Sequence, residues 1–360
     1  MSSEYPAQLR ALMKGLSDFT DCAVISDDID RRYFTGMKSS DGTLVCFRDC
    51  AYLIIDSRYF EKASKAVKGC EVLLQVDLYL QINKLIKKHE AKKVSVDISK
   101  TTVAKKLILE KKIEAALDCS QELEKLVRNI RSVKRQEEIE CMIEAQRIAE
   151  KGFEHMLGFI KPGKTEREIQ LELDFYMLSH GAEALSFDTI ALSGANTSMP
   201  HGVPSDKPVE AGEFVLMDFG AVVEGYHSDM TRTICLGTPS DEMQKVYDIV
   251  LKAQLAGLAA VRSGMKASDL DGIARKIISD EGYGQCFGHS LGHGVGMDIH
   301  ETPFASPKSA EVLKENMIVT VEPGIYLPGK FGVRIEDFVV VKNDGCLNMT
   351  NAPKQLISLM

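Results

Sequence analysis

The sequence lacks several features that define particular classes of protein. No apolar run approaches the roughly 18 residues of a membrane-spanning helix, and the first residues, MSSEYPAQLR, lack the apolar region of a secretory signal. Basic residues are not in excess, because 44 Lys and Arg stand against 52 Asp and Glu, for a net charge of -8. That balance disfavours nucleic acid and anionic membranes as partners. We therefore expect a cytoplasmic protein with neither kind of partner.

The nine cysteines form no CxxC pair and are odd in number. Most of them lie in apolar runs such as LVCF and TICLG, which is typical of buried, reduced thiols in a reducing compartment. Cys286 is the one cysteine whose neighbourhood, a histidine-rich stretch, would suit a catalytic thiol.

At 360 residues the chain exceeds the size at which single hydrophobic cores stop growing, so two domains are expected. Residues 22–80 alternate short apolar runs with turn-forming or helical pieces, as α/β domains do. Residues 122–160 are rich in charge, lack proline and carry apolar residues at helical spacing, which predicts one or two long amphipathic helices. We place the two domains at 1–125 and 126–360.

The second half contains a weak internal repeat. Residues 160–182 and 261–284 match at a constant offset of 101, and each begins with a turn and ends at a glycine. Thr165 and Glu168 form a capping box in the first copy. A duplicated helix-plus-strand unit with a pseudo-twofold axis, and a site at the junction, would explain the match. Two ordinary capped helices could also produce it by chance.

Residues 289–301, HSLGHGVGMDIHE, combine three histidines with alternate glycines. Each glycine would cost a helix about 1 kcal/mol, so an HExxH zinc helix is excluded and an extended segment is favoured. His289 and His293 share one strand parity, whereas His300 joins them only if a bulge intervenes. Glycine in a strand indicates close approach of a ligand or another backbone. A glycine-rich loop with incidental histidines is the alternative.

Two strand-like runs flank the turn dipeptide Glu224-Gly225 within residues 213–237. If that dipeptide is the turn, Asp218 pairs with Thr231, and Asp229 is a diagonal neighbour of Asp218 on the same face. Two aspartates there would repel each other unless a cation or a proton lay between them.

A second candidate hairpin, residues 315–341, carries Glu322 and Glu336 inside apolar strands. A shared face requires an odd loop or a bulge, and Arg334 could make either glutamate an ordinary salt-bridge partner. Taken together, however, the four carboxylates and His293 are too anionic to stay unneutralised in an apolar sheet. They suit two divalent ions of manganese or cobalt type, which would hold a hydroxide and polarise a substrate carbonyl.

At these residues the chain resembles the "pita-bread" metallopeptidases, the family of prolidase, aminopeptidase P, creatinase and methionine aminopeptidase, and most closely the Xaa-Pro peptidase branch. The motifs that carry the resemblance are IDRRYFTG (29–36), IDSRYFEKA (55–63), PHG (200–202), MDFGAVVEGYHSDMTRT, GHGVGMDIHE, VEPGIY and VRIED. The resemblance implies an α+β fold, with a pita-bread catalytic domain preceded by a smaller creatinase/prolidase-like α/β domain.

Carried over by motif position, the resemblance implies roles for individual residues. Asp218 would chelate one metal ion, His293 and Glu322 the other, and Asp229 and Glu336 would bridge both. Glu322 would also accept a proton from the attacking water. The remaining residues would surround the ions: His201 and His300 at the scissile carbonyl, His289 at the residue after the cleaved bond, Tyr326 closing the pocket, and Arg334 holding a bridging carboxylate.

The implied reaction is hydrolysis of the bond before proline in short peptides. Some prolidases carry a basic residue after their HExP element to bind the carboxylate of a dipeptide. In the corresponding segment, HETPFAS, this chain has Phe304. We therefore expect an Xaa-Pro aminopeptidase, with the Xaa-Pro dipeptidase (prolidase) as the alternative. A creatinase-like C–N hydrolase, a silent binding homologue and a purely structural metal site are further alternatives.

The resemblance also implies two divalent metal ions, for which we expect Mn²⁺ with Co²⁺ or Zn²⁺ as alternatives, and a homodimer. His227 is interpreted as a structural histidine. The other three histidines, in helical or turn contexts, are interpreted as surface residues: His89, His155 and His180.

Overall fold

The computed structural model describes residues 5–360, which form two compact units divided between Arg131 and Ser132. The sequence placed this boundary six residues earlier, between 125 and 126. Each unit has its own hydrophobic core.

The first unit is a six-stranded mixed sheet with helices, in the strand order β4-β3-β2-β1-β5-β6. Its first four strands coincide with short apolar runs that the sequence shows within residues 22–80. The strands are β1 (Cys22–Ile25), β2 (Thr43–Phe47), β3 (Ala51–Ile55), β4 (Glu71–Leu74), β5 (Lys93–Val96) and β6 (Ala116–Asp118). The helices are α1 (Ala7–Leu16), α2 (Asp28–Thr35), α3 (Ser57–Ala66), α4 (Leu78–Lys88), α5 (Val103–Lys112) and α6 (Glu122–Ser132).

The charged stretch after residue 120 forms two helices, as the spacing of its apolar residues predicts. α6 ends at Ser132, and α7 (Gln136–Phe159) begins four residues later. The start of α7 is fixed by Glu138, which accepts a hydrogen bond from the backbone N–H of Arg135 at 2.6 Å and so satisfies a donor that the helix leaves free.

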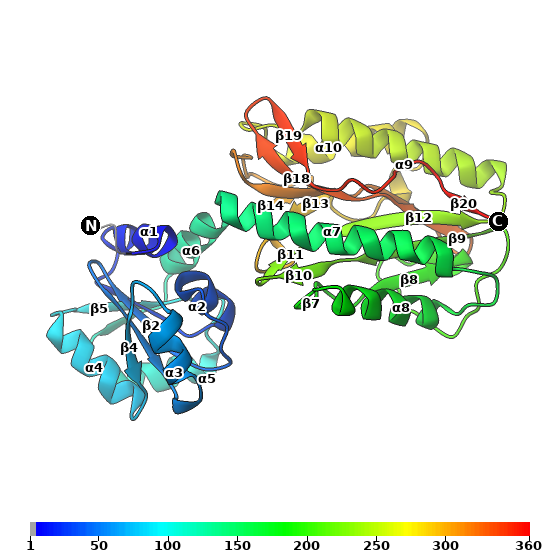
Figure 1. Cartoon of the computed structure of the whole chain (residues 1–360). Helices are drawn as coiled ribbons and strands as arrows, with labels where there is room; N and C mark the ends of the chain where they lie inside the picture. Colours follow the sequence, from blue (N-terminus) through cyan, green and yellow to red (C-terminus); the bar gives the residue numbers. More distant parts are fainter. Residues whose placement is uncertain (1–4) are drawn as a thin grey trace. The chain divides into compact units, whose positions relative to one another are not determined.

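The second unit places strands between two pairs of helices (Figure 1). α7 and α8 (Glu166–Ser179) share one core cluster with the central strands, and α9 (Asp241–Ala260) and α10 (Ala267–Asp280) share another. The strands are β7 (Ala184–Leu185), β8 (Ile190–Ser193), β9 (Glu213–Phe219), β10 (Ala221–Val223), β11 (Tyr226–His227), β12 (Met230–Leu236), β13 (Gly292–Gly294), β14 (Glu301–Ala305), β15 (Ile318–Val321), β16 (Gly324–Leu327), β17 (Phe331–Arg334), β18 (Asp337–Lys342), β19 (Gly345–Asn348) and β20 (Ser358–Leu359). Two 3₁₀ helices are η1 (Gly194–Ser198) and η2 (Gly284–Cys286).

The internal repeat is present as structure. α8 and α10 begin and end exactly 101 residues apart, and an isolated bridge precedes each helix, at Thr165 in the first copy and at Lys266 in the second. The capping box of Thr165 and Glu168 forms as predicted. The offset in the sequence therefore reflects two equivalent helix units on opposite faces of the strands.

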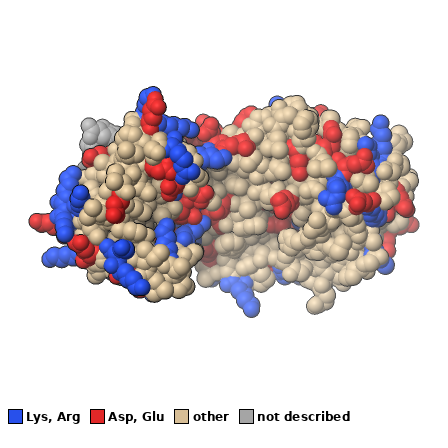
Figure 2. Space-filling model, turned by 90° about the horizontal axis from the view of Figure 1, so that it is seen from below, with Lys and Arg blue, Asp and Glu red and all other residues tan. Residues whose placement is uncertain are grey.

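The surface carries charges of both signs. Figure 2 shows Lys and Arg interspersed with Asp and Glu on the first unit and a broad uncharged area on the second. That view is from the side on which α8 lies in Figure 1, and α8 exposes Leu171, Phe175 and Leu178. Within residues 5–360, no helix is long and apolar enough to cross a membrane.

Candidate active site

The first predicted hairpin forms with the predicted register. Val223 pairs with Tyr226, and Asp218 pairs with Thr231. Both turn residues have left-handed backbone angles, with φ 51° at Glu224 and 85° at Gly225, which suits a two-residue turn that matches the twist of the strands. The hairpin passes from the sheet of β10 and β11 to that of β9 and β12. Asp229 is buried in the gap between β11 and β12.

The second hairpin has the odd loop that a shared face requires. Val321 pairs with Asp337 and Gly324 with Arg334, while residues 328–330 form a three-residue loop. Continuing either ladder places Glu322 opposite Glu336. Neither glutamate lies inside a strand, which corrects the expectation from the sequence. Both lie in two-residue gaps where this hairpin, too, changes sheets.

The histidine and glycine segment is extended, not helical. β13 pairs with β14 with a register shift between His293 and Gly294, but His300 lies in the bend that joins these two strands, so the strand parity expected from the sequence does not apply to it. The rings of His293 and His300 lie 4.4 Å apart between centroids. A Cβ at Gly292 would lie 2.0 Å from the carbonyl oxygen of Thr320. Glycine therefore lets β13 approach the neighbouring strand β15 closely.

The predicted ligands converge in space. His293 Nε2 lies 3.4 Å from Glu322 Oε1 and 3.6 Å from Asp229 Oδ2. Donor atoms of Asp229, His293 and Glu336 all lie within 4.8 Å of one another. The Nδ1 atom of His293 donates to the carbonyl oxygen of Gly294 at 3.0 Å. This tautomer leaves the Nε2 lone pair facing the carboxylates, as a metal ligand requires.

The buried carboxylates of the cluster would be stabilised in their charged form by a nearby cation. Burial raises the pKa of Glu322 to about 8. Burial, followed by the charges of neighbouring carboxylates, also raises the pKa values of Asp229 and Glu336 well above the usual range. Asp218 Oδ1 and Glu336 Oε1 are buried and have no hydrogen-bond partner among the described residues. Orphaned oxygen atoms beside an imidazole fit the donor set of a divalent metal site.

Arg334 binds the carboxylate cluster through hydrogen bonds to Asp218 and Thr231. Its Nη2 donates to Asp218 Oδ2 at 2.5 Å, and its Nε donates to Thr231 Oγ1 at 3.0 Å. Thr231 in turn donates to Glu336 Oε2 at 2.7 Å. Arg334 therefore contacts Asp218 directly and reaches Glu336 through Thr231. Sequence analysis placed Thr231 opposite Asp218 but did not predict its contact with Glu336, because the two residues are 105 positions apart.

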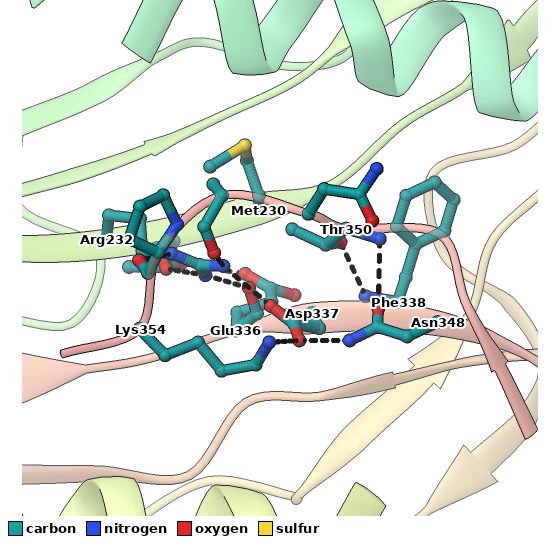
Figure 3. Close-up of polar contacts among 12 residues, drawn as sticks. Met230, Arg232, Glu336, Asp337, Phe338, Asn348, Thr350 and Lys354 are labelled. Carbon is teal, nitrogen blue, oxygen red and sulfur yellow. Dashed lines mark hydrogen bonds and ion pairs between the residues drawn. The ribbon is translucent and has the colours of Figure 1, made fainter. Parts of the chain in front are cut away.

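The backbone at Glu336 is fixed by a buried charged network (Figure 3). Arg232 Nη1 donates to the carbonyl oxygen of Glu336 at 2.6 Å, and its Nη2 donates to Asp337 at 2.8 Å. Asp337 also accepts from Lys354 at 2.8 Å and from Asn348 at 2.6 Å. Burying Arg232 and Asp337 is tolerated because each is paired and hydrogen-bonded. The network therefore fixes the backbone position of Glu336, while Thr231 bonds its side chain.

A cavity of about 720 Å³ opens onto the carboxylates. The exposed side chains of His201 and His300 line it, and Phe304, which is 43% exposed, lines it as well. His289 also lines the cavity, but both of its ring nitrogens are engaged: Nδ1 at 2.8 Å from the carbonyl of Ser290 and Nε2 at 2.9 Å from the hydroxyl of Tyr326.

Tyr326 is buried behind His289. Its hydroxyl accepts a hydrogen bond from Arg334 Nη1 at 2.9 Å while it contacts His289. The side chain therefore supports the cavity wall from inside the protein, and its hydroxyl is linked to the cavity through His289.

Arg167, at the start of α8, lines the cavity and was not singled out from the sequence. Its Nε donates to Asp206 at 3.2 Å in an exposed ion pair. Thr320 was also missed. It accepts from the backbone N–H of His293 at 2.9 Å and lies 3.2 Å from Glu322 Oε1, so it connects two ligands.

The remaining histidines divide into two groups. His155 is exposed on α7, and His180 is exposed in the turn directly after α8, as expected. His227 is half-buried, and its Nδ1 has no partner among residues 5–360. His89 is not a surface residue, which corrects the sequence-based expectation: it is half-buried against Phe47 and Tyr52. Cys286, the one candidate thiol, is not among the cavity-lining residues in the described part of the chain.

Comparison with known proteins gives the same family over both units. Residues 140–343 match metallopeptidase family M24, and residues 7–133 match the Creatinase/Prolidase N-terminal domain. A Pyrococcus furiosus protein named Xaa-Pro dipeptidase is 35% identical, over 97% of this chain and 99% of that protein.

Two solved structures are similar along nearly the whole chain. The Xaa-Pro dipeptidase from Bacillus anthracis has a TM-score of 0.95 at 38% identity, with 98% of this chain and 99% of that chain covered. The X-Pro aminopeptidase from Thermotoga maritima has a TM-score of 0.88 at 36% identity, with 94% and 97% covered. The expected fold, a pita-bread domain after a smaller α/β domain, is confirmed.

Proposed function

Because the chain belongs to metallopeptidase family M24 and carries a Creatinase/Prolidase N-terminal domain, we propose that it is an Xaa-Pro dipeptidase acting with two divalent metal ions. The observation that carries the proposal is the convergence of His293 with four carboxylates from two hairpins at the base of one cavity. The dipeptidase takes precedence over the aminopeptidase expected from the sequence, because relatives that cover nearly the whole chain bear the dipeptidase name.

The residues that would hold the ions are Asp218, Asp229, His293, Glu322 and Glu336. The unpartnered oxygen atoms of Asp218 and Glu336 support this assignment, as does the fixed tautomer of His293. When bound, such ions lower the pKa of a water molecule and polarise a carbonyl group. Mn²⁺ is proposed because carboxylate-rich donor sets favour hard ions, with Co²⁺ or Zn²⁺ as alternatives.

The side chains around the cluster have distinct proposed tasks. Glu322 accepts the proton of the attacking water, because its carboxylate lines the cavity next to His293. His201 and His300 face the cavity and donate hydrogen bonds to the scissile carbonyl as negative charge develops on its oxygen. His289, held by Ser290 and Tyr326, presents its ring to the residue after the cleaved bond.

A dipeptidase must bind the free carboxylate of its substrate. Phe304 stands where some prolidases have a basic residue, so the carboxylate requires another cation. Two arginines line the cavity, and Arg334 is engaged by Asp218, Tyr326 and Thr231. Within residues 5–360, Arg167 has only the exposed Asp206 as a charged partner, and it is the proposed anchor, because a guanidinium binds a carboxylate through two parallel hydrogen bonds.

The second candidate is an Xaa-Pro aminopeptidase. Phe304 and the Thermotoga maritima relative favour it, and such an enzyme needs room for a departing peptide chain rather than a carboxylate anchor.

The deciding experiment compares an Xaa-Pro dipeptide with the matching Xaa-Pro-Yaa tripeptide, both with added Mn²⁺. The dipeptidase proposal expects the dipeptide to be turned over at least about 10-fold faster, in kcat/KM, because one charge-assisted hydrogen bond contributes roughly 1.5–3 kcal/mol. Faster turnover of the tripeptide would favour the aminopeptidase. Turnover of neither, with metal bound, would contradict both peptidase assignments.

We also propose a cytoplasmic homodimer. Nine free cysteines support a reducing compartment. The exposed apolar stripe on α8, formed by Leu171, Phe175 and Leu178, supports contact with a second copy. Sedimentation of the wild type and of Phe175→Glu measures this directly, and a monomeric wild type would contradict the proposal.

A further inference from the structure

The N-terminal unit contains a second group of metal-ligating side chains, far from the cavity in sequence. Among residues 5–360, two groups of three such side chains place their ligand atoms within 4.8 Å of one another, and Asp49, Cys50 and His89 are one of them. Asp49 and Cys50 lie in the turn between β2 and β3, and His89 directly follows α4. Cys50 and His89 are half-buried, while Asp49 is exposed.

The distances within this group suit one tetrahedral ion. Cys50 Sγ lies 3.7 Å from His89 Nδ1 and 3.5 Å from Nε2. Zinc bonds of about 2.3 Å to sulfur and 2.0–2.1 Å to nitrogen place those two atoms roughly 3.5 Å apart at a tetrahedral angle. The distance from the sulfur to Nδ1 is therefore close to the value that a shared zinc ion requires, and a small rotation of the Cys50 and His89 side chains would direct both donor atoms at one ion.

The imidazole ring is already fixed in position. It stacks on Phe47, with centroids 4.3 Å apart, and its Nε2 lies 2.8 Å from the hydroxyl of Tyr52. Lys88 donates to the same hydroxyl at 2.9 Å. When Nε2–H donates to Tyr52, Nδ1 keeps a free lone pair, and Cys50 Sγ lies 3.7 Å from this nitrogen. A hydrogen bond of this kind to the distal nitrogen orients histidine ligands in metal sites generally.

We propose that Asp49, Cys50 and His89 bind one zinc ion, with a water molecule as the fourth ligand. On binding, the Cys50 thiol loses its proton to solvent and forms a thiolate–zinc bond, so the thiolate and the carboxylate balance the charge of the ion. A thiolate and an imidazole select zinc over manganese, whereas the oxygen-rich cluster of the cavity favours harder ions. The two sites would therefore take different metals.

The proposed ion connects segments that are separate in the sequence. It links the β2–β3 turn to the end of α4, and Cys50 and His89 are 39 residues apart. Because such a site does not exist in the unfolded chain, the binding free energy adds to the stability of this unit. A nucleophilic role for Cys50 is disfavoured, because burial raises the pKa of its thiol to about 11 and little thiolate is present without a metal.

Titration of the metal-free, full-length protein with Co²⁺ tests the site by absorption. A thiolate ligand gives a charge-transfer band in the near ultraviolet. The described residues lining the cavity include no cysteine, so the catalytic cluster does not produce this band. We expect the band to arise from one Co²⁺ ion per chain, in addition to the Co²⁺ that the catalytic cluster takes up without producing it, and to disappear when Zn²⁺ is added.

Variants assign the band to residues. Cys50→Ser and His89→Gln should abolish it, and Asp49→Asn should weaken Co²⁺ binding at least about 10-fold, in line with loss of a charged ligand. Cys119→Ser is the matched control, because Cys119 is another half-buried thiol in the same core cluster, and it should retain the band. Absence of the band in the wild type, or its persistence in Cys50→Ser, would overturn the proposal.

A second measurement avoids substitutions. Alkylation of the native wild type, mapped by mass spectrometry, should become at least 10-fold slower at Cys50 when Zn²⁺ is present, about the protection that a modest excess over Kd gives. Alkylation of Cys119 should not change. Equal rates at Cys50 with and without zinc would contradict the site.

Discussion

Glu322 and Glu336 lie opposite each other at the point where one hairpin leaves one sheet and joins another. Asp229 occupies an equivalent gap in the other hairpin. Regular cross-strand pairing is interrupted at these positions, so the side chains do not have to alternate between two faces of a sheet. The interruptions turn carboxylates from both hairpins toward His293, which faces Asp229 and Glu322.

Replacing one carboxylate of the cluster should raise the stability of the metal-free protein but lower its peptidase activity. Glu336→Gln removes a carboxyl group whose ionisation is opposed by burial and then by the neighbouring carboxylates, so we expect the metal-free variant to unfold at a higher temperature than the metal-free wild type. Mn²⁺ at 100 times its Kd should stabilise the wild type by about 2.7 kcal/mol for each of the two ions, or roughly 10–20 °C in total, and the variant by less than half as much. Xaa-Pro hydrolysis should decrease more than about 100-fold.

Scanning calorimetry with and without metal, together with peptide assays, measures these effects. Glu315→Gln, at an exposed position, is the control and should behave as wild type. Full activity of Glu336→Gln after chelation of metal would contradict the proposed metal site.

Thr231 should affect metal binding through its two hydrogen-bond partners, Arg334 and Glu336. Thr231→Val removes the acceptor of Arg334 Nε and the donor to Glu336 Oε2. We expect metal affinity and kcat/KM to decrease about 10- to 100-fold, as for other groups that orient metal ligands, and Thr231→Ser to restore both.

Thr233→Val is the matched control on the same strand, because Thr233 bonds only the backbone of Arg334. Isothermal titration with Mn²⁺ distinguishes the two positions. Equal loss of metal affinity in both valine variants would indicate a general structural effect.

His289 should make stability depend on acid pH. Burial, followed by the positive charge of Arg334, lowers the pKa of His289 from 6.5 to about 4. The folded chain therefore favours the neutral ring, so this contribution is fully present above pH 6.5 and is lost as the pH falls through 4. Between these limits, the unfolding free energy of the wild type should decrease by on the order of 1–3 kcal/mol more than that of His289→Gln.

Urea titrations across that pH range measure the difference. The exposed His180 provides the control, and His180→Gln should follow the wild type. Parallel pH profiles for the wild type and His289→Gln would show that burial of this ring does not depend on its protonation.

Arg167 should determine affinity for the substrate carboxylate. Arg167→Met should raise KM for an Xaa-Pro dipeptide about 10- to 100-fold, because a charge-assisted hydrogen bond is lost, while kcat changes little. KM for the corresponding dipeptide amide should not change. Arg167→Lys should recover part of the effect, since lysine keeps the charge without the bidentate geometry. An unchanged KM for the dipeptide would place the anchor elsewhere.

Local rules account for what the sequence predicted correctly. The turn at Glu224-Gly225 sets the register that pairs Asp218 with Thr231, and the odd loop around Gly329 sets the register that opposes Glu322 and Glu336. The offset of 101 residues gives the equivalence of α8 and α10. In each case turn geometry and periodicity act over short stretches of chain, which the sequence displays directly.

The tertiary structure decided which residues from distant parts of the sequence contact one another in the site. Only packing brings Thr231 to Glu336 across 105 residues, turns Arg334 toward Asp218, and places Arg167 at the cavity. Packing also moves His89 from an expected surface position to Cys50 and Tyr52. These contacts depend on close packing between distant elements, for which no short-range spacing in the sequence is a signal. The sequence by itself thus determined which groups are proposed to carry the chemistry, and the folded chain decided which residues hold and surround them.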